Sequence, residues 1–323
     1  MLAEITVQRF SPEALAPSHP SDSRGTVSKE PQTSHYTVHY NRGETLLLAL
    51  LKIKAEIDGT LTFRASCRAA ICGSCPMQVN GVVKLACRVS LREELDRYGK
   101  IDVGPMPNTP VIKDLVVDLS PFWQKVKAIT PYVVSSHELV PTASLKNIHE
   151  KLHHADACIL CGACLSVCST NEVSPKFLGP AALAKSYRFM VDPRDKIQKK
   201  RLELLQGADG IWDCVRCNLC VSVCPKEVAP MDQIVRLRRL SLLAGLDQTV
   251  AARHITQFVK IVGQEGRLNE TRLPLQIVWG DWKKLFRMIP LGIKMFLRGK
   301  TPFPFSWHKG RKEIQRLFER MGK

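Results

Sequence analysis

The sequence predicts an α+β protein in which a domain containing strands comes first and helices follow. Alternating apolar and polar residues occur early in the chain, apolar residues at helical spacing dominate later, and twelve cysteines fall into three groups of four. We expect a first domain over residues 1–118, a second over 119–246 and a helical C-terminal extension over 247–323.

Two candidate strands open the first domain. Residues 4–10 and 34–40 alternate in polarity, which is typical of strands that pair with each other. The residues between them, 11–34, are rich in Pro, Ser and charge, so we expect an exposed insertion.

A helix, a short strand and a hairpin complete the first domain. Residues 45–57 have an apolar helical pattern, and residues 60–63 are predicted to form a short strand. Asn80-Gly81, within residues 78–85, is a strong signal for a tight hairpin turn. Strand, strand, helix, cysteine loop and hairpin follow the order of a β-grasp domain.

The second half of the chain is predicted to be helical. Residues 121–150 are interpreted as a connector, and helices are expected at 180–191, 196–205 and 231–246. These helices flank the second and third cysteine groups, which predicts an α-helical domain built around them.

The spacing of the cysteines predicts iron-sulfur clusters. The first group has the C-x4-C-x2-C spacing with a distant fourth cysteine that plant-type 2Fe-2S proteins use: Cys67, Cys72, Cys75 and Cys87. The second group is Cys158, Cys161, Cys164 and Cys168, and the third is Cys214, Cys217, Cys220 and Cys224. Each reads C-x2-C-x2-C-x3-C, the bacterial ferredoxin run whose fourth cysteine binds the other cluster. This rule assigns one 4Fe-4S cluster to Cys158, Cys161, Cys164 and Cys224, and another to Cys168, Cys214, Cys217 and Cys220.

The loop of the first group is suited to a cluster. Gly73 and the small side chains of residues 64–75 allow backbone amides to approach the sulfurs. Such N–H···S hydrogen bonds help to set the reduction potential of a cluster.

Zinc, disulfides and a Rieske centre are the alternatives. Zinc ribbons use two C-x2-C pairs and need neither a third nearby cysteine nor a C-x4-C loop. Residues 1–12 have neither the basic start nor the apolar segment of a signal peptide, so we expect a reducing compartment rather than disulfides. His153 and His154 precede Cys158, but a Rieske site replaces two cysteines by histidines, and here each set already has four thiolates.

Positive charge and aromatic residues gather in the C-terminal extension. The net charge is +17, and residues 272–323 hold thirteen Lys and Arg residues against three acidic ones, together with three of the five tryptophans. Such a segment suits nucleic acid or an anionic membrane surface. No nucleic-acid-binding module is recognisable elsewhere, so a nucleic-acid partner, as in a zinc-stabilised scaffold, is disfavoured.

One amphipathic helix is predicted within this extension. Residues 282–298 place six residues on one side, and Pro290 is expected to kink the helix. The six are Leu285, Met288, Ile289, Gly292, Ile293 and Phe296. A membrane surface and a partner subunit remain equally open for this face. No stretch reaches 18 uncharged apolar residues, so no spanning helix is expected.

Several long motifs resemble one known family, the iron-sulfur subunits of succinate dehydrogenase and fumarate reductase. These motifs are LTFRASCRAAICGSCPMQVNG, VIKDLVVDLSPFW, CILCGACLSVC, KFLGPAALAKSYRFMVDPRD and CNLCVSVCPKEVAP, and the resemblance runs from about residue 4 to residue 246. It implies an electron-transfer subunit of the respiratory chain and tricarboxylic acid cycle, placed between a flavoprotein with covalent FAD and a membrane-associated subunit that reacts with quinone. It also implies a peripheral position on the cytoplasmic face of a membrane. No catalytic constellation of its own is visible, so the substrate site is expected on the flavoprotein.

The chain departs from the common form of this family in three ways. Cys217 stands where an aliphatic residue is usual beside a 3Fe-4S cluster, so we expect a second 4Fe-4S cluster, the alternative being a free Cys217 next to 3Fe-4S. Residues 169–173 and Val215 replace the tryptophan and histidine of the usual quinone site. The chain also continues well past residue 246.

Together these departures resemble non-classical succinate dehydrogenases, whose anchor is a cysteine-rich subunit lying on the membrane. The alternative function is an electron-transfer subunit of a thiol:fumarate or heterodisulfide-reductase-type complex.

Overall fold

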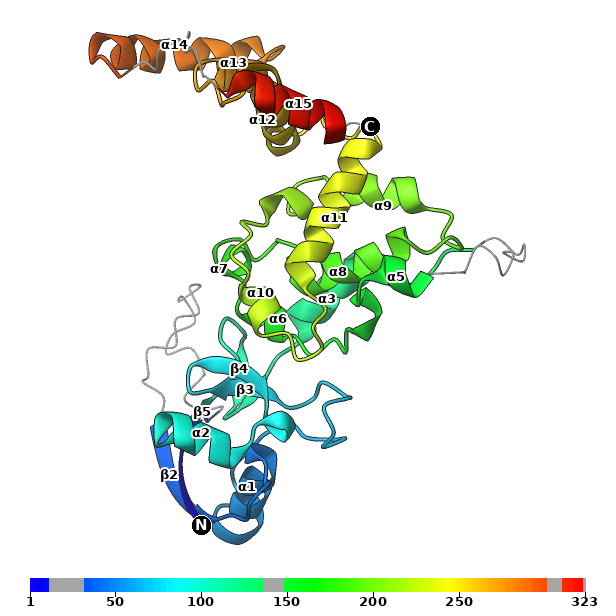
Figure 1. Ribbon diagram of the computed structural model, residues 1–323. Helices are drawn as coiled ribbons and strands as arrows, with labels where there is room; N and C mark the ends of the chain where they lie inside the picture. The colour runs from blue at the N-terminus through cyan, green and yellow to red at the C-terminus, as the bar shows by residue number, and fades with distance from the viewer. Residues whose placement is uncertain (12–31, 136–147, 301–309, 322–323) are drawn as a thin grey trace, which may run out of the picture. The chain divides into compact units, whose positions relative to one another are not determined.

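The computed structural model describes residues 1–11, 32–135, 148–300 and 310–321 (Figure 1). The chain divides into two compact units, Met1–Arg238 and Arg239–Lys323. The domain limits predicted at residues 118 and 246 stay a prediction. Most of the predicted insertion, residues 12–31, lies outside the described residues.

A mixed five-stranded sheet forms the N-terminal part of the first unit. Its strand order is β2-β1-β5-β3-β4, with β1 antiparallel to β2 and parallel to β5, and β3 antiparallel to both β4 and β5. The strands are β1 (Leu2–Arg9), β2 (Gln32–His39), β3 (Pro76–Val79), β4 (Val82–Leu85) and β5 (Ile101–Gly104). The predicted pairing of the first two strands is confirmed. Residues 32–34 belong to β2, which shortens the predicted insertion.

The hairpin predicted at Asn80-Gly81 is also confirmed. Both residues have positive φ, 47° and 80°, as a two-residue type I′ turn between β3 and β4 requires.

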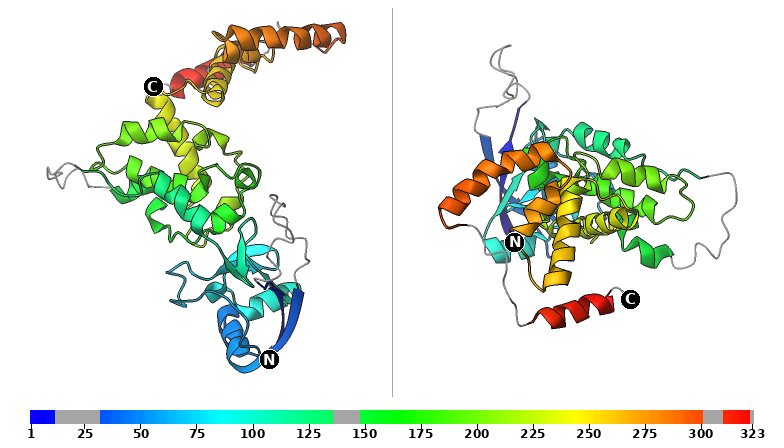
Figure 2. Two further views of the ribbon diagram at one scale, coloured as in Figure 1. Left: turned by 180° about the vertical axis from the view of Figure 1, so that it is seen from behind. Right: turned by 90° about the horizontal axis from the view of Figure 1, so that it is seen from above.

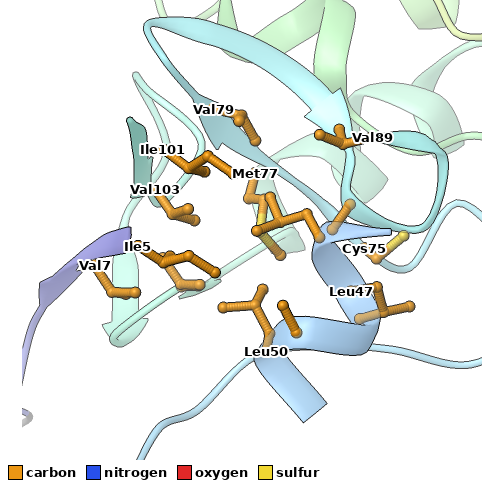
Figure 3. Close-up of a cluster of buried hydrophobic side chains, with 14 of the residues drawn as sticks. Ile5, Val7, Leu47, Leu50, Cys75, Met77, Val79, Val89, Ile101 and Val103 are labelled. Atoms are coloured by element: carbon orange, nitrogen blue, oxygen red, sulfur yellow. The ribbon is translucent and has the colours of Figure 1, made fainter. Parts of the chain in front are cut away.

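One helix packs on the sheet and closes the core. It begins as α1 (Leu46–Lys52) and continues as a π-helix, η2 (Ile53–Ile57), where a regular α-helix was expected. Figure 3 shows the apolar side chains that meet between sheet and helix: Ile5, Val7, Met77, Val79, Ile101, Val103, Leu47 and Leu50. Cys75 belongs to the same hydrophobic core, so this core extends to the first cysteine group.

The strand predicted at residues 60–63 is wrong. The Thr62 amide donates to the Asp114 carboxylate at 2.9 Å, and the Leu115 amide donates to the Thr62 carbonyl at 3.2 Å. The backbone groups of Thr62 are therefore satisfied by a loop about fifty residues further along the chain, and the amides of Thr60 and Leu61 are satisfied locally by Asp58, rather than by a neighbouring strand. Elements that the sequence pattern missed are α2 (Leu91–Tyr98), β5 and the small β6–β7 pair (Val111–Lys113 and Val116–Val117).

The remainder of the first unit is helical and centres on α8 (Gly179–Met190). Four helices pack against α8: α3 (Ser120–Ala128), the short η4 (Ala155–Ala157), α6 (Ala163–Ser166) and α9 (Gln198–Leu205). The predicted helices are confirmed as α8, α9 (Gln198–Leu205) and α11 (Pro230–Leu243). The other elements are α5 (Ile148–Leu152), η4 (Ala155–Ala157), α6 (Ala163–Ser166), α7 (Ser169–Val173), η5 (Ile211–Asp213) and α10 (Leu219–Ser222).

The connector predicted at residues 121–150 is wrong in its first part. Helix α3 (Ser120–Ala128) begins with Pro121 in its first turn, and it buries Phe122 and Val126 against Leu165 and Ala181. This segment is therefore part of the core of the helical region.

The second unit holds four helices among its described residues, α12 (Val250–Glu265), α13 (Arg272–Val278), α14 (Trp282–Leu297) and α15 (Arg311–Met321). Helix α12 packs against α13 and α15, and α14 contacts α13. Gly263 permits the close approach of α15, because a Cβ there would lie 2.9 Å from the Phe318 ring. Figures 1 and 2 show α14, in orange, extending beyond the other helices of its unit. None of the helices in the described part of the chain is long and apolar enough to cross a membrane.

Candidate metal centre

The loop of the first cysteine group directs backbone amides toward cysteine sulfurs. Arg68, Ala70 and Gly73 all have positive φ, between 54° and 68°, which turns successive N–H groups inward. The amides of residues 69, 71 and 72 donate to Cys67 Sγ at 3.3–3.4 Å, and the Ala70 amide donates to Cys87 Sγ at 3.3 Å. The expected approach of amides to these sulfurs is therefore confirmed.

This first group is open to solvent on one side and closed on the other. Cys67 and Cys72 are exposed, whereas Cys75 and Cys87 are buried in the core of the β-grasp domain. A hydrogen bond from Ser74, with help from amides of the loop, lowers the pKa of Cys72 to about 6. Burial raises the pKa of Cys75. The two exposed sulfurs are thus the ones a partner could approach.

The second and third groups have the same local backbone. Cys158 and Cys214 are 56 residues apart, and the short helices η4 and η5 end immediately before them. At the same offset, Leu160 and Gly162 have positive φ in one run, and Arg216 and Asn218 have it in the other. Helices α6 and α10 then begin at equivalent positions. The two runs are therefore structural repeats.

One cavity brings cysteines of both runs together. Its walls include Cys158, Cys161 and Cys164 from the second group and Cys224 from the third. Apolar residues complete it, among them Ala181, Ala184, Val228 and Pro230. Burial, followed by repulsion from Cys158 and Cys224, raises the pKa of Cys161 to about 11. The sulfurs that the crossed ligand rule groups therefore lie around one apolar space.

The remaining four cysteines also lie near one another. Burial raises the pKa of Cys168, and the charges of Cys214 and Cys217 raise it further. Burial likewise raises the pKa of Cys220 to about 12, with added repulsion from the other three. The sulfurs of this set therefore act on each other electrostatically, as neighbours do.

This last set reaches the surface of its unit through Cys217, whereas Cys168 and Cys220 are buried. Cys217 is exposed, as are Val215 and Leu219 beside it, at 67% and 43%. Arg238 of α11 holds the loop from the inside, because its guanidinium donates to the carbonyls of Ile211, Trp212 and Cys214.

Two contacts join the first cysteine loop to the helical region. A Cβ on Gly73 would lie 2.9 Å from the Ile159 carbonyl oxygen and 3.0 Å from Cys161 Cβ, so the two cysteine loops touch there. The guanidinium of Arg88 donates to the Pro225 carbonyl at 2.8 Å. The sequence pattern missed both roles, although Arg88 directly follows Cys87 and Pro225 directly follows Cys224, which is the signal that could have drawn attention to them.

The side chains present fit iron-sulfur clusters. Each set offers four thiolates and no harder ligand, with amide donors or an apolar wall around the sulfurs. Within the described residues, no three His, Cys, Asp or Glu side chains converge on a position for one metal ion. The thiolates that hold a cluster are distributed over two or more iron atoms, so they surround a volume rather than a point. His153 and His154 are exposed and do not line the cavity.

Comparison with known families agrees with this geometry. Residues 4–124 match the model of a 2Fe-2S iron-sulfur cluster binding domain, and residues 154–228 match that of a 4Fe-4S dicluster domain. The protein is thus an iron-sulfur protein with an N-terminal 2Fe-2S ferredoxin domain followed by a helical 4Fe-4S domain.

Curated relatives define the family more closely. The fumarate reductase iron-sulfur subunit of Haemophilus influenzae is 36% identical over 244 residues, covering 71% of this chain and 89% of the relative. The Mycobacterium tuberculosis subunit of the same name is 39% identical over 221 residues, covering 67% and 88%. The chain belongs to the family of iron-sulfur subunits of fumarate reductase and succinate dehydrogenase, and it is an electron-transfer subunit of such an oxidoreductase complex.

A solved structure shares the fold. A chain of the Mycobacterium smegmatis Sdh1 complex in the apo form matches with a TM-score of 0.62 at 24% identity, covering 74% of this chain and 95% of that one. The predicted fold class is confirmed.

Proposed function

We propose that this chain carries electrons through three clusters in series, between an FAD-containing flavoprotein subunit and a membrane-associated subunit. The observation that carries this proposal is the arrangement of the twelve cysteines. They gather into three sets, of which the first and the last include exposed cysteines, while the set between them lines an enclosed apolar cavity. The Gly73–Cys161 contact brings the first two sets together.

The proposed ligand sets follow the crossed rule. The 2Fe-2S cluster is held by Cys67, Cys72, Cys75 and Cys87, one 4Fe-4S cluster by Cys158, Cys161, Cys164 and Cys224, and the other by Cys168, Cys214, Cys217 and Cys220. When bound, each cluster supplies a one-electron redox centre. The chain contributes the amides that donate to Cys67, which stabilise negative charge on the first set. The apolar wall around the second set keeps water away from it.

The acceptor side is proposed to be of the non-classical type, with two 4Fe-4S clusters. Cys217 occupies the position in its run that Cys161 occupies in the other, 56 residues earlier, and the two loops have the same backbone. The positions that carry the usual quinone-binding tryptophan and histidine hold Ser169–Val173 and Val215 here, and Val173 and Val215 are strongly exposed. This favours transfer to a docked, cysteine-rich subunit, with the quinone pool reached indirectly.

The substrate chemistry is proposed to lie on the flavoprotein. The cavity around Cys158, Cys161, Cys164 and Cys224 is otherwise lined by apolar residues and Lys226, which supply no acid–base pair for a dicarboxylate.

Cys217→Ser tests the cluster assignment. Wild-type protein should contain about ten iron atoms per chain, from one 2Fe-2S and two 4Fe-4S clusters. The variant should lose iron from the last cluster alone, and an EPR signal of the 3Fe-4S type should appear in the oxidised state. Val215→Ser, an exposed neighbour in the same loop, is the control and should leave the iron content unchanged. Equal iron in wild type and Cys217→Ser, with a 3Fe-4S signal already present in wild type, would contradict the two-cubane assignment.

The partner proposal has a separate test. When the complex is purified from its native membranes, a subunit with covalently bound flavin should co-purify with this chain. A complex that turns over a dithiol and holds no covalent flavin would instead support the thiol-linked alternative.

A further inference from the structure

Helix α14 presents an uncovered apolar face. Five large side chains on that face, spaced alternately four and three residues apart, are between 47% and 71% exposed: Trp282, Phe286, Ile289, Ile293 and Phe296. Leu297 extends the same face and is also exposed. An apolar surface of this extent is uncommon on a soluble protein and indicates a binding surface.

All of the charged residues on the opposite face of α14 are basic. Lys283, Arg287 and Lys294 are exposed there, and Arg298 follows directly after the helix. No acidic residue occurs between positions 282 and 297. A face that binds a protein partner commonly mixes both signs, because charge pairs set register and orientation, whereas a single positive sign complements a surface of anionic headgroups.

The unit that carries α14 has a core without it. Ala252, Ile261 and Leu273 are buried on α12 and α13, and Gly263 receives the Phe318 ring of α15. Helix α14 touches α13 and extends away from the remaining helices (Figure 2). Its apolar face is therefore not needed to close the packing of its own unit, within the residues that the structure describes.

The dimensions of α14 suit the surface of a bilayer rather than its interior. Sixteen residues extend for about 24 Å, less than the roughly 30 Å of a hydrocarbon core. At 100° per residue, the apolar residues of α14 cover about half of the helix circumference. This apolar face is wider than the narrow stripe by which one helix of a coiled coil contacts its partner. Trp279 and Trp282, both exposed, sit at its N-terminal end, and tryptophan favours the headgroup region.

We propose that α14 is an interfacial helix that binds a lipid surface containing anionic headgroups, with the basic face toward the phosphates. The inserted side chains are Trp282, Phe286, Ile293 and Phe296. Lipid binding by α14 requires only this helix and its unit, and is independent of the cluster ligands and of the identity of the electron acceptor.

The test is flotation of the full-length, cluster-loaded protein with vesicles of phosphatidylcholine, with and without phosphatidylglycerol. We expect binding to the vesicles with phosphatidylglycerol, weaker binding without it, and a loss of binding as salt is raised. The double variant Ile293→Gln with Phe296→Gln keeps the charge but removes two inserted side chains, and should weaken binding by at least about tenfold.

Leu291→Gln is the matched control. Leu291 is 59% exposed on the same helix but lies on the basic side, so its replacement should leave flotation unchanged. Failure of the wild-type protein to float overturns the proposal, as does equal flotation of the wild type and the double variant. Self-association that the double variant abolishes, without vesicle binding, would assign the face to a second copy of the chain. Binding of a soluble subunit in place of vesicles, lost in the same variant, would assign it to a protein partner.

Discussion

At the scale of single residues, Gly73 combines two constraints. Its φ of +68° disfavours any side chain, and the space beside it is filled by Ile159 and by Cys161 of the neighbouring cysteine loop. The glycine therefore allows the first and second cysteine sets to approach as closely as two backbones can. Any side chain at this position must push those sets apart.

Gly73→Ala is expected to destabilise the protein more than left-handed strain alone. Gly99 has a similar φ of +72° but nothing within 4 Å, so Gly99→Ala measures the strain, about 1 kcal/mol. Gly73→Ala adds overpacking and should lose about 3 kcal/mol in total. Denaturant unfolding of both variants measures the difference. Electron transfer from the first to the second set should slow only in Gly73→Ala, and equal behaviour of the two variants would remove the role assigned to the contact.

At the scale of elements, α9 is held to α3 by one buried cation. Arg201 is paired with Asp195 at 2.9 Å, and both side chains are almost fully buried. The same guanidinium donates to the carbonyls of Ile129, Thr130 and Tyr132, just past the end of α3. Asp195 has a second donor in the Val134 amide, at 3.0 Å, whereas the guanidinium is the donor to the buried Ile129 carbonyl.

Replacing Arg201 by Met should cost about 3–5 kcal/mol, because the buried Asp195 carboxylate loses its charge partner and the buried Ile129 carbonyl loses its donor. Lys200→Met, an exposed neighbour on the same helix, should change stability by less than about 0.5 kcal/mol. Chemical denaturation followed by circular dichroism measures both. A small loss in Arg201→Met would show that the network is dispensable.

The segment before α9 is expected to give an acid-sensitive contribution to stability. Two hydrogen bonds from Arg194 to Asp192, at 2.7 and 2.8 Å, lower the pKa of this carboxyl. A lowered carboxyl pKa stabilises the fold above the unfolded value of about 3.9, and this stabilisation is lost as the pH falls toward the folded value.

Asp192→Asn should therefore reduce the free energy of unfolding at pH 7, and the gap from wild type should shrink below about pH 4. Asp96→Asn, whose side chain is 70% exposed, is the control and should show a small gap at every pH. Thermal unfolding between neutral and acid pH provides the measurement. A gap for Asp192→Asn that stays constant with pH would exclude this linkage.

Local signals were predicted well, and contacts between distant segments were not. The Asn80-Gly81 hairpin depends on two adjacent residues, and α8 on a regular apolar period, so both were visible in the sequence. Residues 60–63 have a strand-like composition, but the backbone of Thr62 hydrogen-bonds to Asp114 and Leu115, which no local pattern reveals. Helix α3 was missed although Pro121 in its first turn and the Phe122–Val126 spacing are helix signals.

In the candidate site too, features that follow from local spacing were predicted, and contacts between distant segments were not. The crossed grouping of Cys224 with Cys158, Cys161 and Cys164 follows from a known spacing rule, and one cavity holds all four. The Gly73–Cys161 contact and the Arg88–Pro225 hydrogen bond arise from the docking of two domains, so no spacing within either cysteine run contains them.

At the scale of the whole molecule, the cysteine-bearing unit and the C-terminal unit are separable. The family model of the second domain ends at residue 228, and the first compact unit ends at Arg238, within α11. All twelve cysteines precede this point. The C-terminal unit therefore adds a surface rather than a redox centre.

Truncation after Leu246 should leave iron content and the visible spectrum unchanged and should abolish flotation with anionic vesicles. Iron analysis and flotation on the same preparation measure the two effects. Loss of iron on truncation would show that the C-terminal unit supports the cluster-bearing fold instead.

The cavity shared by the two cysteine repeats has a consequence for biogenesis. Cys224 completes a wall whose other cysteines are 60 or more residues earlier in the chain, so a nascent polypeptide lacks that wall until residue 224 has left the ribosome. Without Cys224 this cavity has only three of its four cysteines, and a chain whose synthesis stops between the repeats exposes those thiols. On the proposed ligand sets, loading of this site follows translation of both repeats, which makes it a checkpoint for a product that contains both of them.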